Sequence, residues 1–153
     1  MPDDGKTIYK TCRELTGLTQ ERAAELLNLS VRHLARIECG ELIPSDEIVR
    51  NMGLLYQDGR YLEARHLHDS SALASSIIPA IENVSIQTAV MRLFNATVTF
   101  ADNHRNKQLI RIAEDGQIDE AERLGFDSIV EELDDIIQAA LEVRLAAGKE
   151  RDT

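Results

Sequence analysis

The sequence predicts an all-α protein, and two observations support this prediction. Apolar residues recur at spacings of three and four along most of the chain, and no stretch shows the alternation of apolar and polar residues that marks a strand. The most regular example is the apolar series from Phe126 to Leu145, with acidic residues such as Glu131 and Glu142 on the opposite side. We therefore expect an amphipathic helix there that buries one face.

The charge of the chain is acidic and unevenly distributed. The 153 residues have a formal net charge of −10. Residues 1–60 hold 8 basic against 10 acidic residues, a net charge of −2, whereas residues 61–153 hold 9 against 17, a net charge of −8. This composition excludes a protein that coats nucleic acid by bulk attraction, and it assigns any DNA contact to the first part of the chain.

The sequence contains no apolar segment long enough to cross a membrane and no export signal at its N-terminus. We therefore expect a cytoplasmic protein that makes no membrane contact. In a reducing compartment Cys12 and Cys39 are expected to be free thiols.

Residues 18–40 are predicted to form two short helices joined by a tight turn. Thr19 and Ser30 are hydroxyl residues that can cap the free backbone N–H groups at the start of each helix. Gly40 follows the second helix and can end it. Two capped helices with a short polar break between them form a helix-turn-helix.

The second of these helices, residues 31–38, has two different faces when its residues are placed about 100° apart. Leu34 and Ile37 fall on one side and are expected to face the core. The opposite side is small and cationic, and its residues are Arg32 and Arg36, flanked by Val31 and Ala35. A helix of this length fits within the DNA major groove, where a guanidinium group matches the two acceptors of guanine.

Residues 6–57 resemble the Cro/cI-like helix-turn-helix repressors, known as the Xre family. The matching features, in chain order, are Arg13, the Leu18-Thr19-Gln20 start of the second helix, Ala24, the turn at residues 28–30, residues 37–40, Pro44 and a closing helix over residues 45–56. The resemblance implies an N-terminal five-helix-type DNA-binding domain, which an acidic α-helical C-terminal region follows.

The resemblance also implies roles for individual residues. It places Gln20 and Ser30 near phosphate, and it makes Arg13 and Glu38 an internal ion pair. It places Val31, Arg32 and Arg36 against bases; since Val31 is apolar, we expect it to contact a thymine methyl group. His33 lies at the edge of the same helix, where a phosphate contact and an ordinary surface position are both open. The predicted DNA-binding residues are therefore Gln20, Ser30, Val31, Arg32, His33, Ala35 and Arg36.

We expect a DNA-binding domain over residues 6–59, a connecting segment over 60–79, and a helical dimerisation or partner-binding region over 80–148. The predicted function is a sequence-specific transcriptional regulator, a repressor that binds double-stranded DNA as a homodimer. Two alternatives remain open at this point. One is an antitoxin-type autorepressor whose C-terminal part binds a toxin, and the other is a protein-binding adaptor built on the same fold.

An enzyme and a metalloprotein are both unexpected. The sequence has no Gly-rich phosphate loop and no nucleophile elbow. Residues 115–122 resemble the second half of a calcium-binding loop, but Arg111 and Ala113 stand where oxygen ligands are required. We expect Gly116 to end one helix, and Asp119 and Glu122 to cap the next. No cofactor is predicted.

Overall fold

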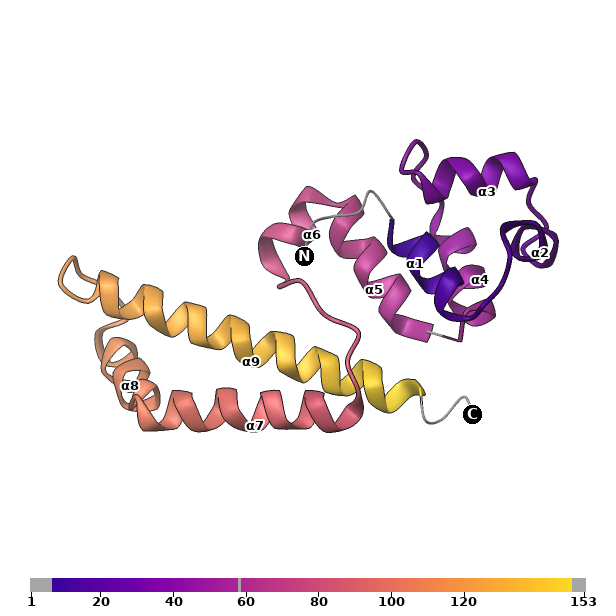
Figure 1. Ribbon diagram of the computed structural model, residues 1–153. Helices are drawn as coiled ribbons and strands as arrows, with labels where there is room; N and C mark the ends of the chain where they lie inside the picture. Colours follow the sequence, from indigo (N-terminus) through magenta and orange to yellow (C-terminus); the bar gives the residue numbers. More distant parts are fainter. Residues whose placement is uncertain (1–6, 58, 150–153) are drawn as a thin grey trace. The chain divides into compact units, whose positions relative to one another are not determined.

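The computed structural model describes residues 7–57 and 59–149, and within these ranges all regular structure is helical (Figure 1). The all-α prediction is thereby confirmed. The helices, in chain order, are α1 (Ile8–Leu15), α2 (Gln20–Leu26), α3 (Val31–Glu38), α4 (Asp46–Leu55), α5 (Gly59–Ser70), α6 (Ala72–Ile77), α7 (Ile86–Asp102), α8 (Arg105–Asp115) and α9 (Arg123–Lys149). The chain divides into two compact units, which we describe separately: among the described residues, unit 1 comprises those up to Ser76 together with residues 147–149, and unit 2 is Ile77–Ala146.

Unit 1 encloses a hydrophobic core to which all of the first five helices contribute. The buried side chains of this core are Tyr9, Cys12, Ala23, Ala24, Leu34, Ile37, Val49, Met52, Tyr56 and Leu62. Among the helix pairs, α4 packs on α5, α2 on α3, and α1 on both α3 and α5. Because each short helix buries only a few side chains, the helices stabilise one another rather than standing alone.

The structure places α5 in unit 1, whereas the sequence predicted a connecting segment from residue 60. Leu62 is fully buried in the core, and His66, four residues later, is 6% exposed. The inward side of α5 therefore includes a histidine, which weakens the apolar pattern that would otherwise mark a core helix. The compact unit extends to Ser76, beyond the predicted boundary at residue 59.

Unit 2 contains α7, α8 and the part of α9 up to Ala146. Apolar residues recur at helical spacing over residues 86–113, and the structure forms two helices there, α7 and α8. They are separated at His104, whose φ of 56° lies in the left-handed region. Gly116 ends α8 with φ of 70°. The Asp119 carboxylate then accepts a hydrogen bond from the backbone N–H of Glu122 at 2.8 Å, and the Glu122 carboxylate accepts one from the N–H of Asp119 at 3.3 Å. This reciprocal capping box precedes α9.

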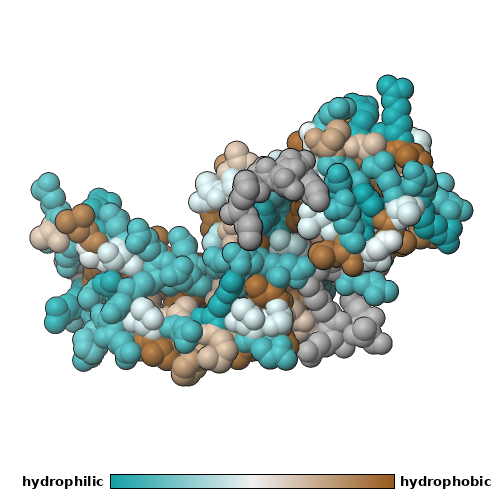
Figure 2. Space-filling view, viewed as in Figure 1, coloured by the Kyte–Doolittle hydropathy of each residue, from teal (hydrophilic) through white to brown (hydrophobic). Residues whose placement is uncertain are grey.

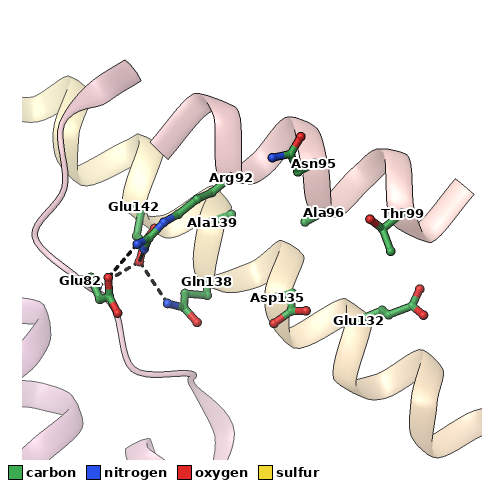
Figure 3. Close-up of a pocket in the computed structure, with 10 residues that line it drawn as sticks. All are labelled: Glu82, Arg92, Asn95, Ala96, Thr99, Glu132, Asp135, Gln138, Ala139 and Glu142. Carbon is green, nitrogen blue, oxygen red and sulfur yellow. Dashed lines mark hydrogen bonds and ion pairs between the residues drawn. The ribbon is translucent and has the colours of Figure 1, made fainter. Parts of the chain in front are cut away.

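The most buried charged side chain of unit 2 is Glu142 on α9, which is 1% exposed. The sequence placed Glu142 on the polar side of this helix, opposite the apolar series, yet its side chain is buried. Its oxygens accept hydrogen bonds from Arg92 Nη1 at 3.1 and 3.2 Å, from Gln138 Nε2 at 3.1 Å and from the backbone N–H of Glu82 at 3.0 Å (Figure 3). These bonds compensate the loss of hydration of the carboxylate and join α7 to α9.

Candidate nucleic-acid interface

The turn between α2 and α3 is defined by local capping interactions. The Thr19 hydroxyl accepts a hydrogen bond from the backbone N–H of Arg22 at 3.2 Å, and the Ser30 hydroxyl accepts one from the N–H of His33 at 3.1 Å. Between them Asn28 has φ of 55°, a left-handed conformation that asparagine tolerates better than most residues. Each hydroxyl satisfies a backbone donor at the start of its helix, so the two helices begin at defined residues.

Helix α3 separates its buried and exposed residues as the sequence predicts. Leu34 and Ile37 are fully buried. Arg32 and Arg36 are exposed on the other side, and Val31 is 41% exposed at the first position of the helix. His33 and Ala35 are half-buried, and Ser30 is exposed just before the helix. The outward side of α3 therefore presents two long cationic side chains and one apolar one.

Arg13 and Glu38, which the resemblance makes an ion pair, meet inside unit 1. Arg13 Nε lies 2.6 Å from Glu38 Oε1, and Arg13 Nη2 lies 2.9 Å from Oε2. Their side chains are 9% and 2% exposed. Arg13 Nη1 also donates to the backbone carbonyl of Leu18 at 2.7 Å. This bidentate contact connects α1 to the end of α3, and hydrogen bonding to the carboxylate raises the pKa of Arg13.

The structure gives Gln20 a partner within the protein. Its Nε2 atom donates a hydrogen bond to Glu38 Oε2 at 2.9 Å, and the contact is partly buried. Gln20 therefore belongs to the same polar network as Arg13 and Glu38, and this network holds α2 against α3. The phosphate contact predicted for Gln20 stays a prediction.

The two arginines of α3 differ in their surroundings. Arg36 Nε lies 3.5 Å from Glu41 Oε2, and the two side chains are 50% and 65% exposed. An exposed ion pair of this kind contributes little stability, so Glu41 does not prevent Arg36 from changing partners. Within the described residues no ion pair involves Arg32.

One segment of the chain matches a known protein family. Residues 10–52 match the helix-turn-helix family model. This match confirms the resemblance of the segment to Cro/cI-type regulators of the Xre family, and it covers less than a third of the chain. The comparisons with curated proteins and with solved structures gave no match. The helix-turn-helix match supports a DNA-binding regulator.

None of the helices in the described part of the chain is long and apolar enough to cross a membrane. No group of three or more histidine, cysteine, aspartate or glutamate side chains within residues 7–57 and 59–149 is arranged to hold a metal ion. Cys12 is buried and Cys39 is exposed, and neither of them forms a disulfide bond.

A polar cluster that the sequence did not predict joins three helices of unit 1; Tyr9 and His66 are buried in it, whereas the Asp46 side chain is exposed. The Tyr9 hydroxyl of α1 lies 2.7 Å from His66 Nδ1 of α5, and His66 Nε2 lies 3.3 Å from Asp46 Oδ1 at the start of α4. Burial, with a smaller contribution from Asp69, raises the pKa of Tyr9 to about 12, so its hydroxyl stays neutral. No local pattern could reveal a contact between residues 57 positions apart, and none of the three residues belongs to α2 or α3.

Proposed function

We propose that this protein is a sequence-specific transcriptional regulator of the cytoplasm that acts as a repressor, with α3 reading the DNA major groove. The observation that supports this most directly is the division of α3 into a buried side and a cationic side. Leu34 and Ile37 fix the helix to the core, while Arg32 and Arg36 project into solvent. A helix whose exposed side had only a structural role would not need two arginines four residues apart.

The dimensions of α3 suit this role. Its eight residues span about 12 Å, comparable to the width of about 12 Å of the major groove. A guanidinium group can bond both O6 and N7 of guanine, and the exposed Val31 can contact the methyl group of thymine. In this proposal Arg32 and Arg36 read bases, and Ser30 and His33 approach the phosphates beside them.

A repressor of this class also needs two copies of the helix-turn-helix. Its two half-sites lie about 34 Å apart, one turn of DNA, and a homodimer presents two α3 helices in a fixed relation. The buried residues that form the core of unit 1 all lie within residues 9–62. We therefore assign dimerisation to the acidic unit 2.

The base-reading role is tested by replacing Arg32 with alanine. This change should cost about 1–3 kcal/mol of binding free energy on the preferred operator and relax the preference at one base pair, because a bidentate contact to one base is lost. Binding to random DNA should change far less. The measurement is a titration of operator and random duplexes at several salt concentrations, preceded by selection of the preferred sequence from a random pool.

Arg111→Ala is the matched control, since Arg111 is an exposed arginine on α8 and its loss changes the net charge equally. This control should bind the operator like the parent protein. Equal losses on operator and random DNA for Arg32→Ala would contradict base reading, and failure to select any sequence would contradict the proposed function itself.

A further inference from the structure

Helix α7 of unit 2 exposes a row of large apolar side chains. Val90, Met91, Phe94 and Val98 are 47%, 56%, 59% and 39% exposed. Brown and tan atoms, which mark apolar residues, appear over α7 along the lower edge of the molecule in Figure 2. Exposed apolar side chains are ordinary when they are scattered, but a contiguous group of them marks an interaction surface.

These side chains are contiguous because of their spacing along the helix. Val90, Phe94 and Val98 follow one another at intervals of four, and Met91 lies three residues before Phe94. Two small or uncharged residues, Gln87 and Ala101, fall in the same sector and are also exposed. We call this sector the α7 face, and its residues are Gln87, Val90, Met91, Phe94, Val98 and Ala101.

The α7 face contains no charged residue, although unit 2 is strongly acidic. Residues 77–146 hold 13 acidic against 6 basic residues, a net charge of −7. Within α7 only Arg92 and Asp102 are charged. Arg92 is turned away from the α7 face, because it bonds Glu82 and Glu142 in the pocket of about 440 Å³ that Figure 3 shows between α7 and α9. Asp102 lies at the last position of the helix.

Helix α9, which has the more regular apolar series, offers a poorer surface for self-association. Its exposed apolar residues include Val130 and Ile137, which are 39% and 44% exposed. Asp134 is exposed on the same face, four residues after Val130 and three before Ile137. Two copies joined through this face would bring like charges together, which is unfavourable at an interface.

We propose that the α7 face is the surface on which a second copy of this chain docks, with the two α7 helices packed against each other. An uncharged apolar surface offers nothing for a basic or an acidic partner to pair with, whereas a second copy brings an identical uncharged surface. A twofold dimer uses the same patch on both subunits, so the face is complementary to itself. The choice of a second copy rests on the proposed function, which requires two helix-turn-helix units.

The test compares three full-length proteins by sedimentation equilibrium at micromolar concentrations: the parent, Phe94→Glu and Ile137→Glu. Phe94→Glu should raise the dissociation constant of the dimer by more than about tenfold, because it buries an unpaired carboxylate in the interface. Ile137→Glu introduces the same charge at a comparably exposed position of α9 and should leave the dimer unchanged. Far-ultraviolet circular dichroism of all three proteins checks that they stay helical.

A monomeric parent, or a Phe94→Glu variant as dimeric as the parent, would overturn the proposal. Loss of the dimer in Ile137→Glu alone would overturn it as well and would assign the interface to α9. Titration of a single half-site duplex distinguishes a failure of the dimer proposal from a failure of the proposed function. Phe94→Glu should keep the parent's sequence preference on a half-site, whereas a parent that forms the dimer but binds no DNA sequence selectively would overturn the proposed function and leave the dimer interface standing.

Discussion

Replacing Arg13 with alanine should lower the free energy of unfolding of unit 1 by about 3–5 kcal/mol, out of a total of about 5–15 kcal/mol for a typical domain. The change removes the bidentate partner of Glu38, whose side chain is 2% exposed, and leaves a buried carboxylate with fewer donors. The remaining donor to its oxygens, Gln20 Nε2, carries no charge. For a domain of this size the midpoint of thermal unfolding should fall by more than about 10 °C.

Tyrosine fluorescence measures this effect in unit 1 specifically. The chain has no tryptophan, and its three tyrosines, at positions 9, 56 and 61, all lie in unit 1. Arg22→Ala is the matched control, because Arg22 forms an exposed ion pair with Glu25 whose side chains are 55% and 69% exposed. Such a pair contributes about 0–1 kcal/mol. If Arg13→Ala unfolds at the same temperature as Arg22→Ala, the buried pair does not stabilise unit 1.

Ending the chain after Ser76 should reduce the affinity for a complete two-half-site operator by about 100- to 10,000-fold. The second helix-turn-helix of a dimer binds as an intramolecular event, and this advantage disappears when the two copies are no longer joined. The fragment should stay folded although it lacks residues 147–149 of unit 1, since the buried core of that unit lies within residues 9–62. Its affinity for a single half-site should match the affinity with which the parent protein binds a single half-site.

The measurement is a titration of one-half-site and two-half-site duplexes, with light scattering to give the oligomeric state of the fragment. Full-length Phe94→Glu serves as the control, because it retains unit 2 but should lack the dimer. The fragment and full-length Phe94→Glu should then show the same loss of affinity for the two-half-site duplex. A fragment that remains dimeric would show that unit 1 associates without unit 2, contrary to the assignment of dimerisation to unit 2.

The features that the sequence predicted well depend on residues close together in the chain. Thr19 and Ser30 cap their helices through N–H groups three residues away, and Asp119 and Glu122 cap each other at the same spacing. The two faces of α3 follow from the helical period alone. In each case one helical turn of backbone brings the atoms together, so the residues nearby in the sequence are enough to predict the contact.

The features that the sequence did not predict depend on partners far apart in the chain. His66 meets Tyr9 across 57 positions, and Glu142 meets Arg92 across 50. Neither contact follows from the sequence, because a polar or charged side chain on a helix is more often exposed than buried. His66 and Glu142 are each buried where another helix supplies hydrogen-bond partners. The residue pattern within one helix contains no information about the position of the other helix.

The sequence by itself determined that this chain is helical, that residues 31–38 present arginines opposite a buried side, and that residues 6–57 resemble the helix-turn-helix family. Only the tertiary structure decided that Gln20 joins the network of Arg13 and Glu38, and that α7 exposes a row of large apolar side chains. The physical reason is that helical periodicity shows which residues share a face, whereas the packing of other helices determines whether that face is buried or exposed.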